Sequence, residues 1–226
     1  MNRLWVLRHG ESTANVEGLI VSAPGPRALT EVGLTPRGRT QARAAAEVGA
    51  AQGLGSETVV ITSDFARALQ TAEEFAAALG AASPRIDQRL RERSFGRHDE
   101  GPASAYDQVW AVDRDRGTPQ DEVEPVAAVA ARVLAVLAEA DDLAGDAPVV
   151  LVAHGDVLQI ALTLAAGADP HDHRGQPHLG NAELRLLGPA RGVPATDVLT
   201  GDGSTSDRPT SDVSTSDVST GETPRS

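Results

Sequence analysis

The stretch LWVLRHGE at residues 4–11 sets a short apolar run directly before an arginine, a histidine and a glycine. A continuous apolar run of this length is typical of a strand buried on both faces of a parallel sheet, and Gly10 interrupts the run. In open α/β sheets, ligands bind outside the carboxyl ends of the strands, so we expect Arg8 and His9 to face a substrate. The alternative is a strand that ends in an ordinary polar turn, because short motifs also match by chance.

Two further apolar stretches end in the same way. TVVIT at residues 58–62 is followed by Ser63 and, one turn into the next predicted helix, by Arg67. VVLVA at residues 149–153 is followed by His154. If the three strands are parallel neighbours, two imidazoles and two guanidiniums gather at one edge of the sheet. Arginine forks match phosphate oxygens, and a neutral imidazole can attack phosphorus, so this set of side chains favours a phosphate ester.

Helical segments alternate with these strands. Thr35 and Pro36 form a strong helix start, as N-cap and first helical residue, and Ser63 and Asp64 are expected to cap the next helix. The predicted helices cover residues 35–53, 63–80, 106–114, 123–143 and 157–166, with a last edge strand at 182–187. This order predicts one α/β domain over residues 1–198, a three-layer α/β/α sandwich with a mainly parallel central sheet.

Two segments carry no clear periodicity. Residues 12–26 are rich in Gly, Pro, Ser and Asn, and residues 83–102 are heavily charged, so both are expected to be irregular loops, the second with one helical turn.

Beyond Val198 the composition changes to Ser, Thr, Asp and Pro. Residues 199–226 cannot bury enough apolar surface to offset the entropy of ordering, and they are expected to be a disordered tail. An inert solubilising tail is favoured over a phosphorylated or partner-binding segment.

Composition excludes several classes of function. The net charge of -12 argues against general affinity for nucleic acid or an anionic membrane. No apolar run approaches the roughly 20 residues of a bilayer span, and residues 1–3 lead into too short an apolar segment for a signal peptide. A cytoplasmic protein is therefore expected. All 20 basic side chains are arginine, so an arginine is informative here only through its position.

These motifs, taken in order along the chain, resemble those of the histidine phosphatase superfamily, also called the phosphoglycerate mutase-like family. The resemblance runs from the N-terminus to about Leu187. The matching motifs are LRHGE at 7–11 with Asn15, LT at 34–35 with Gly38 and QA at 41–42, TSD at 62–64 with RA at 67–68 and QTA at 70–72, Glu92 with Gly96 and EG at 100–101, and VAHGD at 152–156. The resemblance implies a phosphoglycerate mutase-like fold and six site residues: His9, Glu92, His154, Arg8, Asn15 and Arg67.

The resemblance also implies their roles. His9 becomes phosphohistidine, with its other ring nitrogen held by a backbone carbonyl. Arg8, Arg67 and His154 clamp the phosphoryl oxygens together with Asn15, and Glu92 protonates the leaving oxygen and later activates water. No metal or cofactor is implied.

Each role has a structural alternative. His9 and His154 could be buried core histidines, and Arg67 could be an ordinary helix-surface arginine. Glu92 lies among Arg89, Arg91, Arg93 and Glu100, so a solvated charged loop is an alternative in which another acid serves as the proton donor.

The cluster His171, Asp172, His173 and His178 has metal-ligand side chains. Its spacing fits no helix face and prolines flank it, so we interpret it as a loop that helps to rim the substrate pocket. Tyr106 and Trp110 are interpreted as core or lid aromatics rather than stacking platforms for bases.

The predicted function is hydrolysis of a small phosphorylated metabolite by a metal-independent phosphomonoesterase. The alternatives are a phosphoglycerate-type mutase and a non-catalytic module that binds phosphate. Glu92 and Arg93 match the Glu-Arg pair of the mutases, whereas the longer insertion that mutases carry before the second histidine is missing. The substrate itself depends on loops such as 16–33 and 94–120, and the sequence leaves a monomer and a dimer equally open.

Overall fold

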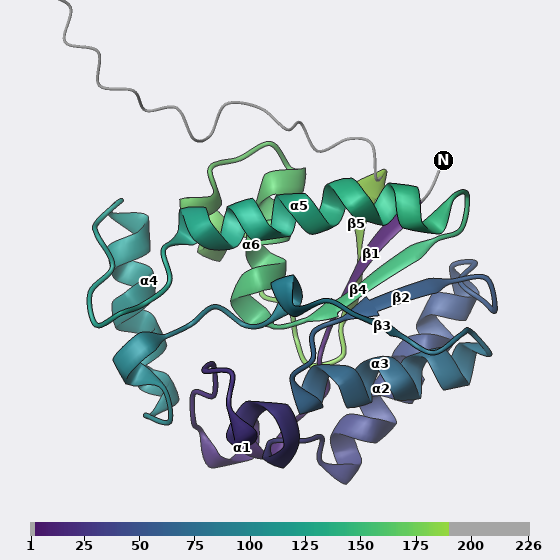
Figure 1. Cartoon of the computed structure of the whole chain (residues 1–226), viewed down its shortest axis with the longest axis horizontal. Coiled ribbons are helices and arrows are strands. Elements are labelled where there is room, and N and C mark those ends of the chain that lie inside the picture. Colours follow the sequence, from purple (N-terminus) through teal and green to yellow (C-terminus); the bar gives the residue numbers. More distant parts are fainter. Residues whose placement is uncertain (1–2, 190–226) are drawn as a thin grey trace, which may run out of the picture. The chain divides into compact units, whose positions relative to one another are not determined.

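The computed structural model describes residues 3–189. Within this range, five strands form one sheet in the order β3-β2-β4-β1-β5 (Figure 1). The strands are β1 (Arg3–Arg8), β2 (Val59–Thr62), β3 (Arg85–Ile86), β4 (Val149–Ala153) and β5 (Leu184–Pro189). The first four run parallel, and β5 pairs antiparallel with β1 at one edge of the sheet. The expected strands at 58–62 and 149–153 and the edge strand near 182–187 are thus confirmed.

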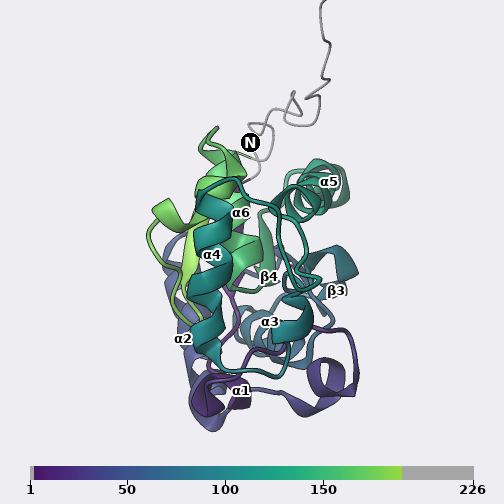
Figure 2. The same cartoon turned by 90° about the vertical axis from the view of Figure 1, so that its left-hand side faces the viewer.

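Helices lie on both faces of the sheet. The α-helices are α1 (Thr13–Glu17), α2 (Pro36–Ala51), α3 (Ala66–Leu79), α4 (Tyr106–Arg114), α5 (Val126–Ala144) and α6 (Gly155–Ala165). Shorter helical turns are η1 (Arg27–Glu31), η2 (Gln88–Leu90), η3 (Gly96–His98), η4 (Ala103–Ala105) and η5 (Pro170–Gly175). The two views show α2 and α3 on one side of the strands and α5 and α6 on the other (Figures 1 and 2). The predicted three-layer α/β/α fold is confirmed.

The alternation of side chains along β1 explains why both faces need cover. Leu4 and Val6 pack into the core cluster formed with α5 and α6. Trp5 and Leu7 pack into the opposite cluster, which contains Phe75 of α3 and small alanines of α2. All four side chains are at most 3% exposed. A strand that is apolar at every position therefore serves two hydrophobic cores at once.

Two glycines allow α2 to approach the loop after β1. A Cβ on Gly10 would lie 2.5 Å from the carbonyl oxygen of Gly38, and a Cβ on Gly38 would lie 2.1 Å from the carbonyl oxygen of Glu11. Neither distance is possible for a real side chain. The start of α2, where Thr35 caps the helix by accepting from Gly38 N at 3.0 Å, is thereby packed directly behind His9.

The segment 12–26, expected to be irregular, contains the short helix α1. Ser12 accepts from the backbone N–H of Asn15, and the Asn15 side chain accepts from the backbone N–H of Ser12. This reciprocal capping starts the helix, and Gly18 ends it in the left-handed conformation at φ 69°. The composition suggested a loop because the same residue types, Ser, Asn and Gly, serve both as helix caps and as turn residues.

Three other boundaries differ from the expectation. The segment 83–102 contains the two-residue edge strand β3, which pairs with β2 and is too short to show a periodic pattern. The N-cap of α3 is Phe65, not Ser63 or Asp64, although Ser63 Oγ still accepts from Phe65 N at 3.2 Å. Helix α5 begins only after Pro125.

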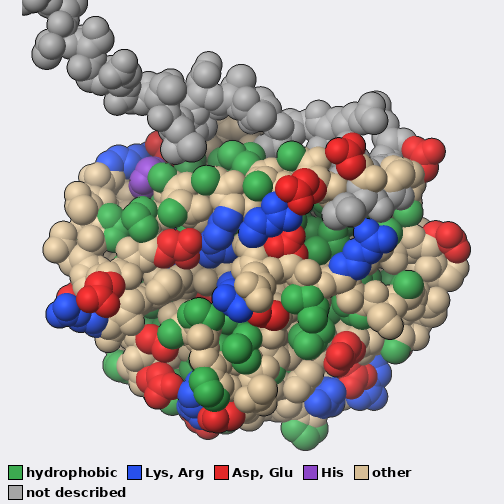
Figure 3. Space-filling model, in the orientation of Figure 1, with side chains coloured by type: hydrophobic (Ala, Val, Ile, Leu, Met, Phe, Trp, Pro, Cys, Tyr) green, Lys and Arg blue, Asp and Glu red, His purple; other side chains and the backbone are tan. Residues whose placement is uncertain are grey.

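The boundary expected at residue 198 and the tail expected at 199–226 lie outside the described residues. No helix within residues 3–189 combines the length and the apolar composition that crossing a membrane requires. On the face shown in Figure 3, acidic and basic side chains are interspersed rather than gathered into a field of one sign.

Candidate active site

Strand register brings the predicted site residues to one edge of the sheet. Arg8 is paired with Ala153, and Thr62 is paired with Val152, so β1, β4 and β2 end side by side. The backbone N–H of His9 continues this pairing by donating to Ala153 O at 3.0 Å. The residues that follow the three strands therefore start from adjacent points.

The His9 ring is 4% exposed and is fixed at both nitrogens. Nδ1 lies 2.8 Å from the carbonyl oxygen of Gly10, which can only accept, so Nδ1 carries the proton. Nε2 accepts a hydrogen bond from Nε of Arg67 at 3.3 Å and is the nitrogen with the lone pair. Burial, together with the charges of Arg67 and Arg8, holds the pKa of His9 well below its usual 6.5. The imidazole is therefore neutral and aims Nε2 into the site.

His154 lies against His9, with the ring centroids 5.2 Å apart, and is fully buried. Its Nε2 lies 3.0 Å from Ser63 Oγ, and the Phe65 ring meets it edge-on at 5.3 Å. Burial, followed by the charge of Arg67 and the neighbouring His9, lowers the pKa of His154 well below 6.5.

Both predicted arginines are anchored by backbone carbonyls. Arg67 donates from Nη2 to Val21 O at 2.9 Å, and Arg8 donates from Nη1 to Leu179 O at 2.7 Å. Burial lowers the pKa of both guanidiniums. The positions of the two charges are thus set by loops that lie far from them in the sequence.

Several buried nitrogens of the site lack an acceptor. In the part of the chain that the structure describes, five buried side-chain nitrogens have no hydrogen-bond partner, and three of them belong to Arg8 (Nε), Arg67 (Nη1) and His154 (Nδ1). The other two belong to Trp5 and His173. Buried donors are almost always paired in folded proteins. The two guanidiniums line one pocket with His9, and the His154 ring lies against His9, so these side chains can receive an oxyanion.

Asn15 reaches the same site from α1. Its Oδ1 accepts from Ser12 and from Nδ2 of Asn181 at 3.2 Å, and within residues 3–189 its own Nδ2 donates to no protein acceptor. Asn181 also donates to His9 O at 3.1 Å. This second asparagine ties the loop before β5 to the nucleophile loop, and the sequence did not point to it because an isolated Asn in a loop is common.

Glu92 lines the same pocket as Arg8, His9 and Arg67. Its Oε1 accepts from the N–H of Arg93 at 3.0 Å. Burial and the nearby Asp156 raise the pKa of Glu92, and Arg67 and Arg8 offset this only in part. A carboxyl group with a raised pKa can be protonated at a pH at which the histidine with a lowered pKa is neutral.

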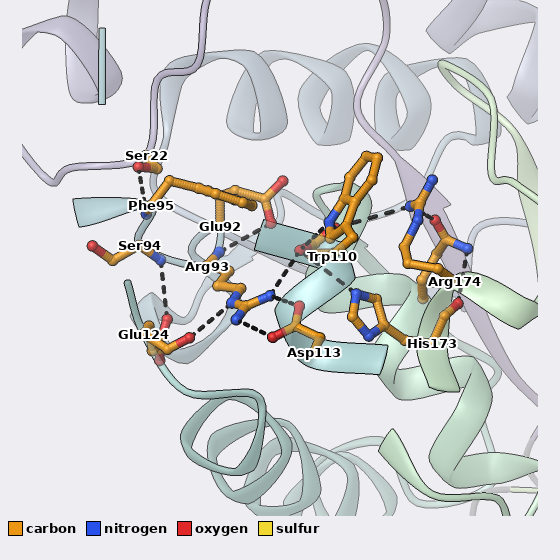
Figure 4. A network of polar contacts seen from close by, with 12 residues as sticks. Ser22, Glu92, Arg93, Ser94, Phe95, Trp110, Asp113, Glu124, His173 and Arg174 are labelled. Atoms are coloured by element: carbon orange, nitrogen blue, oxygen red, sulfur yellow. Dashed lines mark hydrogen bonds and ion pairs between the residues drawn. The ribbon is translucent and has the colours of Figure 1, made fainter. Parts of the chain in front are cut away.

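A network of buried polar side chains supports the acid loop (Figure 4). Arg93 is fully buried and forms two hydrogen bonds with Asp113 of α4, at 2.6 and 2.8 Å. It also lies 3.4 Å from Asp156, whose carboxylate accepts a hydrogen bond from the indole N–H of Trp110 at 3.0 Å. Arg93, directly after Glu92, is therefore joined to Asp156, two residues after His154, and to α4.

The pocket has a deep part and an outer part that share residues. The deep part holds His9 and Arg67, and the outer part extends over Trp110, Arg174 and His178. Both parts are lined by Arg8, Ala14, Asn15, Leu19, Glu92 and Tyr106. The outer part encloses about 510 Å³, some of it open to solvent.

The loop after α6 contributes only one of its three histidines to this pocket. His178 lines it, as expected for a rim residue, whereas His173 is fully buried and His171 pairs with Asp169 at 2.8 Å. Within residues 3–189, no three His, Asp or Glu side chains form a group that could hold a metal ion. Tyr106 and Trp110, stacked at 5.1 Å, form a wall of the pocket, and Tyr106 also packs against the core cluster that contains Phe95.

The chain is similar to several solved structures. A mycobacterial hydrolase (hydrolase 1) is 30% identical with a TM-score of 0.66, over 81% of this chain and 87% of that one. A mycobacterial glucosyl-3-phosphoglycerate phosphatase is 28% identical with a TM-score of 0.64, over 81% and 88%. Bacillus stearothermophilus YhfR, 24% identical with a TM-score of 0.67 over 82% and 90%, supports the fold alone. None of the curated proteins matches the sequence significantly.

The family comparison agrees with the order of the motifs along the chain. The model of the histidine phosphatase superfamily (branch 1) matches residues 4–200, which contain every strand and helix described above except Arg3, the first residue of β1. Because this match covers most of the chain, the protein belongs to the histidine phosphatase superfamily.

Proposed function

We propose that the protein is a phosphomonoesterase that hydrolyses a small phosphorylated metabolite through a phosphohistidine at His9. The observation that carries this proposal is the pair of buried, unpaired guanidinium donors, Arg8 Nε and Arg67 Nη1, on two side chains that line one pocket with His9, while the unpaired Nδ1 belongs to His154, whose ring lies against His9. A phosphoryl group placed in this pocket accepts from the two guanidiniums, and from His154 Nδ1 when that nitrogen carries the proton, and presents its phosphorus to the nucleophile.

In the first step, His9 Nε2 attacks phosphorus and the bond from phosphorus to the ester oxygen breaks. Glu92, whose pKa is raised by burial and by the nearby Asp156, gives its proton to the leaving oxygen. The product alcohol departs, and the phosphoryl group stays on His9. Arg8, Arg67 and Asn15 hold the equatorial oxygens during the transfer.

In the second step, water attacks the phosphohistidine. Glu92 is now a carboxylate and takes a proton from that water, so the acid of the first step is the base of the second. The bond from phosphorus to Nε2 breaks, and inorganic phosphate leaves with His9 neutral again. The Gly10 carbonyl holds the Nδ1 proton throughout, which keeps Nε2 as the reacting nitrogen.

Two guanidiniums at the deep end of the pocket supply the positive charge that the phosphoryl group requires. This supports a mechanism without a divalent ion, which we include in the proposal. The mycobacterial glucosyl-3-phosphoglycerate phosphatase supports the same reaction class, cleavage of a phosphate monoester of a small metabolite.

Rapid quenching with a ³²P-labelled phosphate ester tests the intermediate. We expect an acid-labile, base-stable adduct on His9, and no adduct and no turnover in a folded His9→Ala variant. His171→Ala is the matched control, because this ring is partly exposed and pairs with Asp169 outside the pocket. Label recovered on a serine, or turnover that persists in His9→Ala, would exclude the mechanism.

A further inference from the structure

The outer part of the pocket contains a guanidinium that the reaction above does not use. Arg174, from η5, lines this part together with Trp110 and His178. In Figure 4, Trp110 lies between Glu92 and Arg174. Because Arg8 lines both parts of the pocket, an ester whose phosphate lies against His9 extends its alcohol portion toward Arg174.

Arg174 is held in one position. Its guanidinium carbon lies 3.7 Å from the centroid of the Trp110 ring, and Nη1 donates to Oε1 of Gln159, a buried residue of α6. The side chain is 19% exposed. A stacked and anchored arginine loses little conformational entropy when it binds a ligand, so it is pre-organised for recognition.

The opposite edge of the same guanidinium is free. Within the described residues, neither Nε nor Nη2 of Arg174 donates to a protein acceptor, whereas Nη1 is the atom that contacts both Gln159 and, at 3.9 Å, Asp156. The Nε and Nη2 hydrogens are parallel, and this edge matches the two oxygens of a carboxylate or a phosphate.

The protein does not neutralise this charge well. Asp156, which lies 3.9 Å from Arg174, already accepts from Trp110 and lies closer to Arg93, at 3.4 Å. Gln159 is a neutral acceptor. Burial lowers the pKa of the Arg174 guanidinium by more than the charges of Asp156, Asp107 and Glu92 raise it, as expected for a charge that has lost water without gaining a full partner.

We propose that Arg174 binds a second oxyanion on the leaving group, so that the preferred substrates are phosphate esters that also carry a carboxylate or another phosphate. This proposal rests on the proposed function, because it assigns the scissile phosphate to the deep part of the pocket. His178 lies beside the route between the two subsites: its Nε2 accepts from Arg8 Nη1 at 3.1 Å, which leaves Nδ1–H as a further donor to the same ligand.

Matched substrate pairs test the subsite. The value of kcat/KM is measured for 3-phosphoglycerate against glycerol 3-phosphate, and for fructose 1,6-bisphosphate against fructose 6-phosphate. We expect the wild-type protein to prefer the member with the extra oxyanion in at least one pair, and the pair that responds shows whether that group is a carboxylate or a phosphate. Arg174→Gln should reduce the preference roughly 10- to 100-fold, mainly through KM, as for a lost charge-assisted hydrogen bond.

Two further variants separate recognition from structural support. Arg174→Lys keeps the positive charge but lacks the two parallel N–H donors of the guanidinium, and it should retain part of the preference. Arg97→Gln, which removes an equally charged side chain that is 71% exposed and lies away from the pocket, should leave the preference unchanged. Absence of a preference in the wild-type protein, or equal slowing of both members of every pair in Arg174→Gln, would overturn the subsite while leaving the phosphatase proposal intact.

Binding separates this proposal from the catalytic one. In a His9→Ala background, calorimetry should show that 3-phosphoglycerate or fructose 1,6-bisphosphate binds more tightly than its partner, and that Arg174→Gln removes the difference. This result would support the subsite even if no ester is turned over, in which case only the proposed function fails. Equal binding of both members of each pair would refute the proposed subsite at Arg174.

Discussion

Nε of Arg67 donates to Nε2 of His9 across 3.3 Å, while the Gly10 carbonyl accepts from the other ring nitrogen at 2.8 Å. The arginine therefore has two effects on the imidazole: it fixes the direction of the lone pair, and its charge disfavours protonation of the ring. The same charge acts on Glu92 in the direction that lowers its pKa, although burial outweighs it. One side chain thus influences both titrating groups of the proposed mechanism.

Replacing Arg67 should change the titration of His9. In Arg67→Gln, one of the causes that depress the pKa of His9 is lost, so this pKa rises toward 6.5 and the acid limb of the kcat/KM profile moves to higher pH. We also expect kcat/KM to fall by roughly 10²- to 10³-fold, because a donor to the transferring group is removed. NMR titration of the His9 ring and a pH–rate profile measure the two effects. Arg97→Gln is the control, and an unchanged pKa in Arg67→Gln would contradict the electrostatic argument.

Glu92→Gln should discriminate between leaving groups. A poor leaving group such as an alkoxide needs a proton, so hydrolysis of alkyl phosphates should slow by roughly 10²- to 10⁴-fold, whereas p-nitrophenyl phosphate should slow much less in the phosphoryl-transfer step. We assign the basic limb of the pH–rate profile to loss of the Glu92 proton, so this limb should be absent in Glu92→Gln. Presteady-state rates for the two esters provide the measurement, with Glu122→Gln, an exposed carboxylate, as control. Equal slowing of both esters would mean that Glu92 positions a group and does not donate the proton.

The strands that carry the site could be predicted because their sequences are unambiguous. The stretches 4–7, 59–61 and 149–153 are apolar throughout, which is typical of strands buried on both faces. Once these strands are parallel neighbours, the meeting of His9 and His154 follows from the geometry of the sheet. The structure adds the order β2-β4-β1, which places β4 between the other two.

Other parts of the site depend on contacts that the sequence does not encode locally. Arg174 is distinguished from the other arginines only because Trp110, 64 residues earlier (174 − 110 = 64), packs against it. Asn181 matters because it reaches back to His9 and Asn15. Likewise, β3 has only two residues and is defined by its pairing with β2. In each case the information lies in a long-range contact rather than in a motif.

The buried pair of Arg93 and Asp113 should be important for stability. Removing the carboxylate in Asp113→Ala leaves a guanidinium that is 0% exposed with Asp156 as its remaining carboxylate partner, at 3.4 Å. Breaking one partner of a buried pair costs roughly 3–5 kcal/mol of unfolding free energy. Urea denaturation measures this loss. The exposed pair of Arg97 and Glu122 provides the comparison, and Glu122→Ala should leave the midpoint nearly unchanged. A comparably small effect of Asp113→Ala would show that the pair contributes little to stability.

Chelators should leave the rate unchanged. In the proposed mechanism, the charge that develops on the phosphoryl oxygens is stabilised by Arg8, Arg67 and His154, and no step requires a divalent ion. Initial rates before and after extended dialysis against EDTA should agree within error. Activity that is lost in EDTA and restored by added zinc or magnesium would contradict this, and substitution of His171 and His173 would then show whether that loop holds the ion.

The last prediction is that the enzyme transfers the phosphoryl group to water rather than to a second hydroxyl of the bound product. A mutase must protect its phosphoenzyme from hydrolysis, and exclusion of water is what separates the two outcomes. Glu92 and His154 are 154 − 92 = 62 positions apart, and this interval holds α4, α5 and β4, so little chain is left for an additional lid. The Glu92-Arg93 pair matches the mutases in sequence, but the Arg93 guanidinium is fully buried against Asp113 and cannot contact a ligand.

Incubation with 3-phosphoglycerate and catalytic 2,3-bisphosphoglycerate tests this directly. We expect inorganic phosphate to be released, with 2-phosphoglycerate formed no faster than in the absence of enzyme. The His9→Ala variant controls for contaminating activity, because both reactions require the nucleophile. Formation of 2-phosphoglycerate well above the rate of phosphate release would establish a mutase. That result would also mean that the short segment around α4 closes over the phosphoenzyme tightly enough to exclude water.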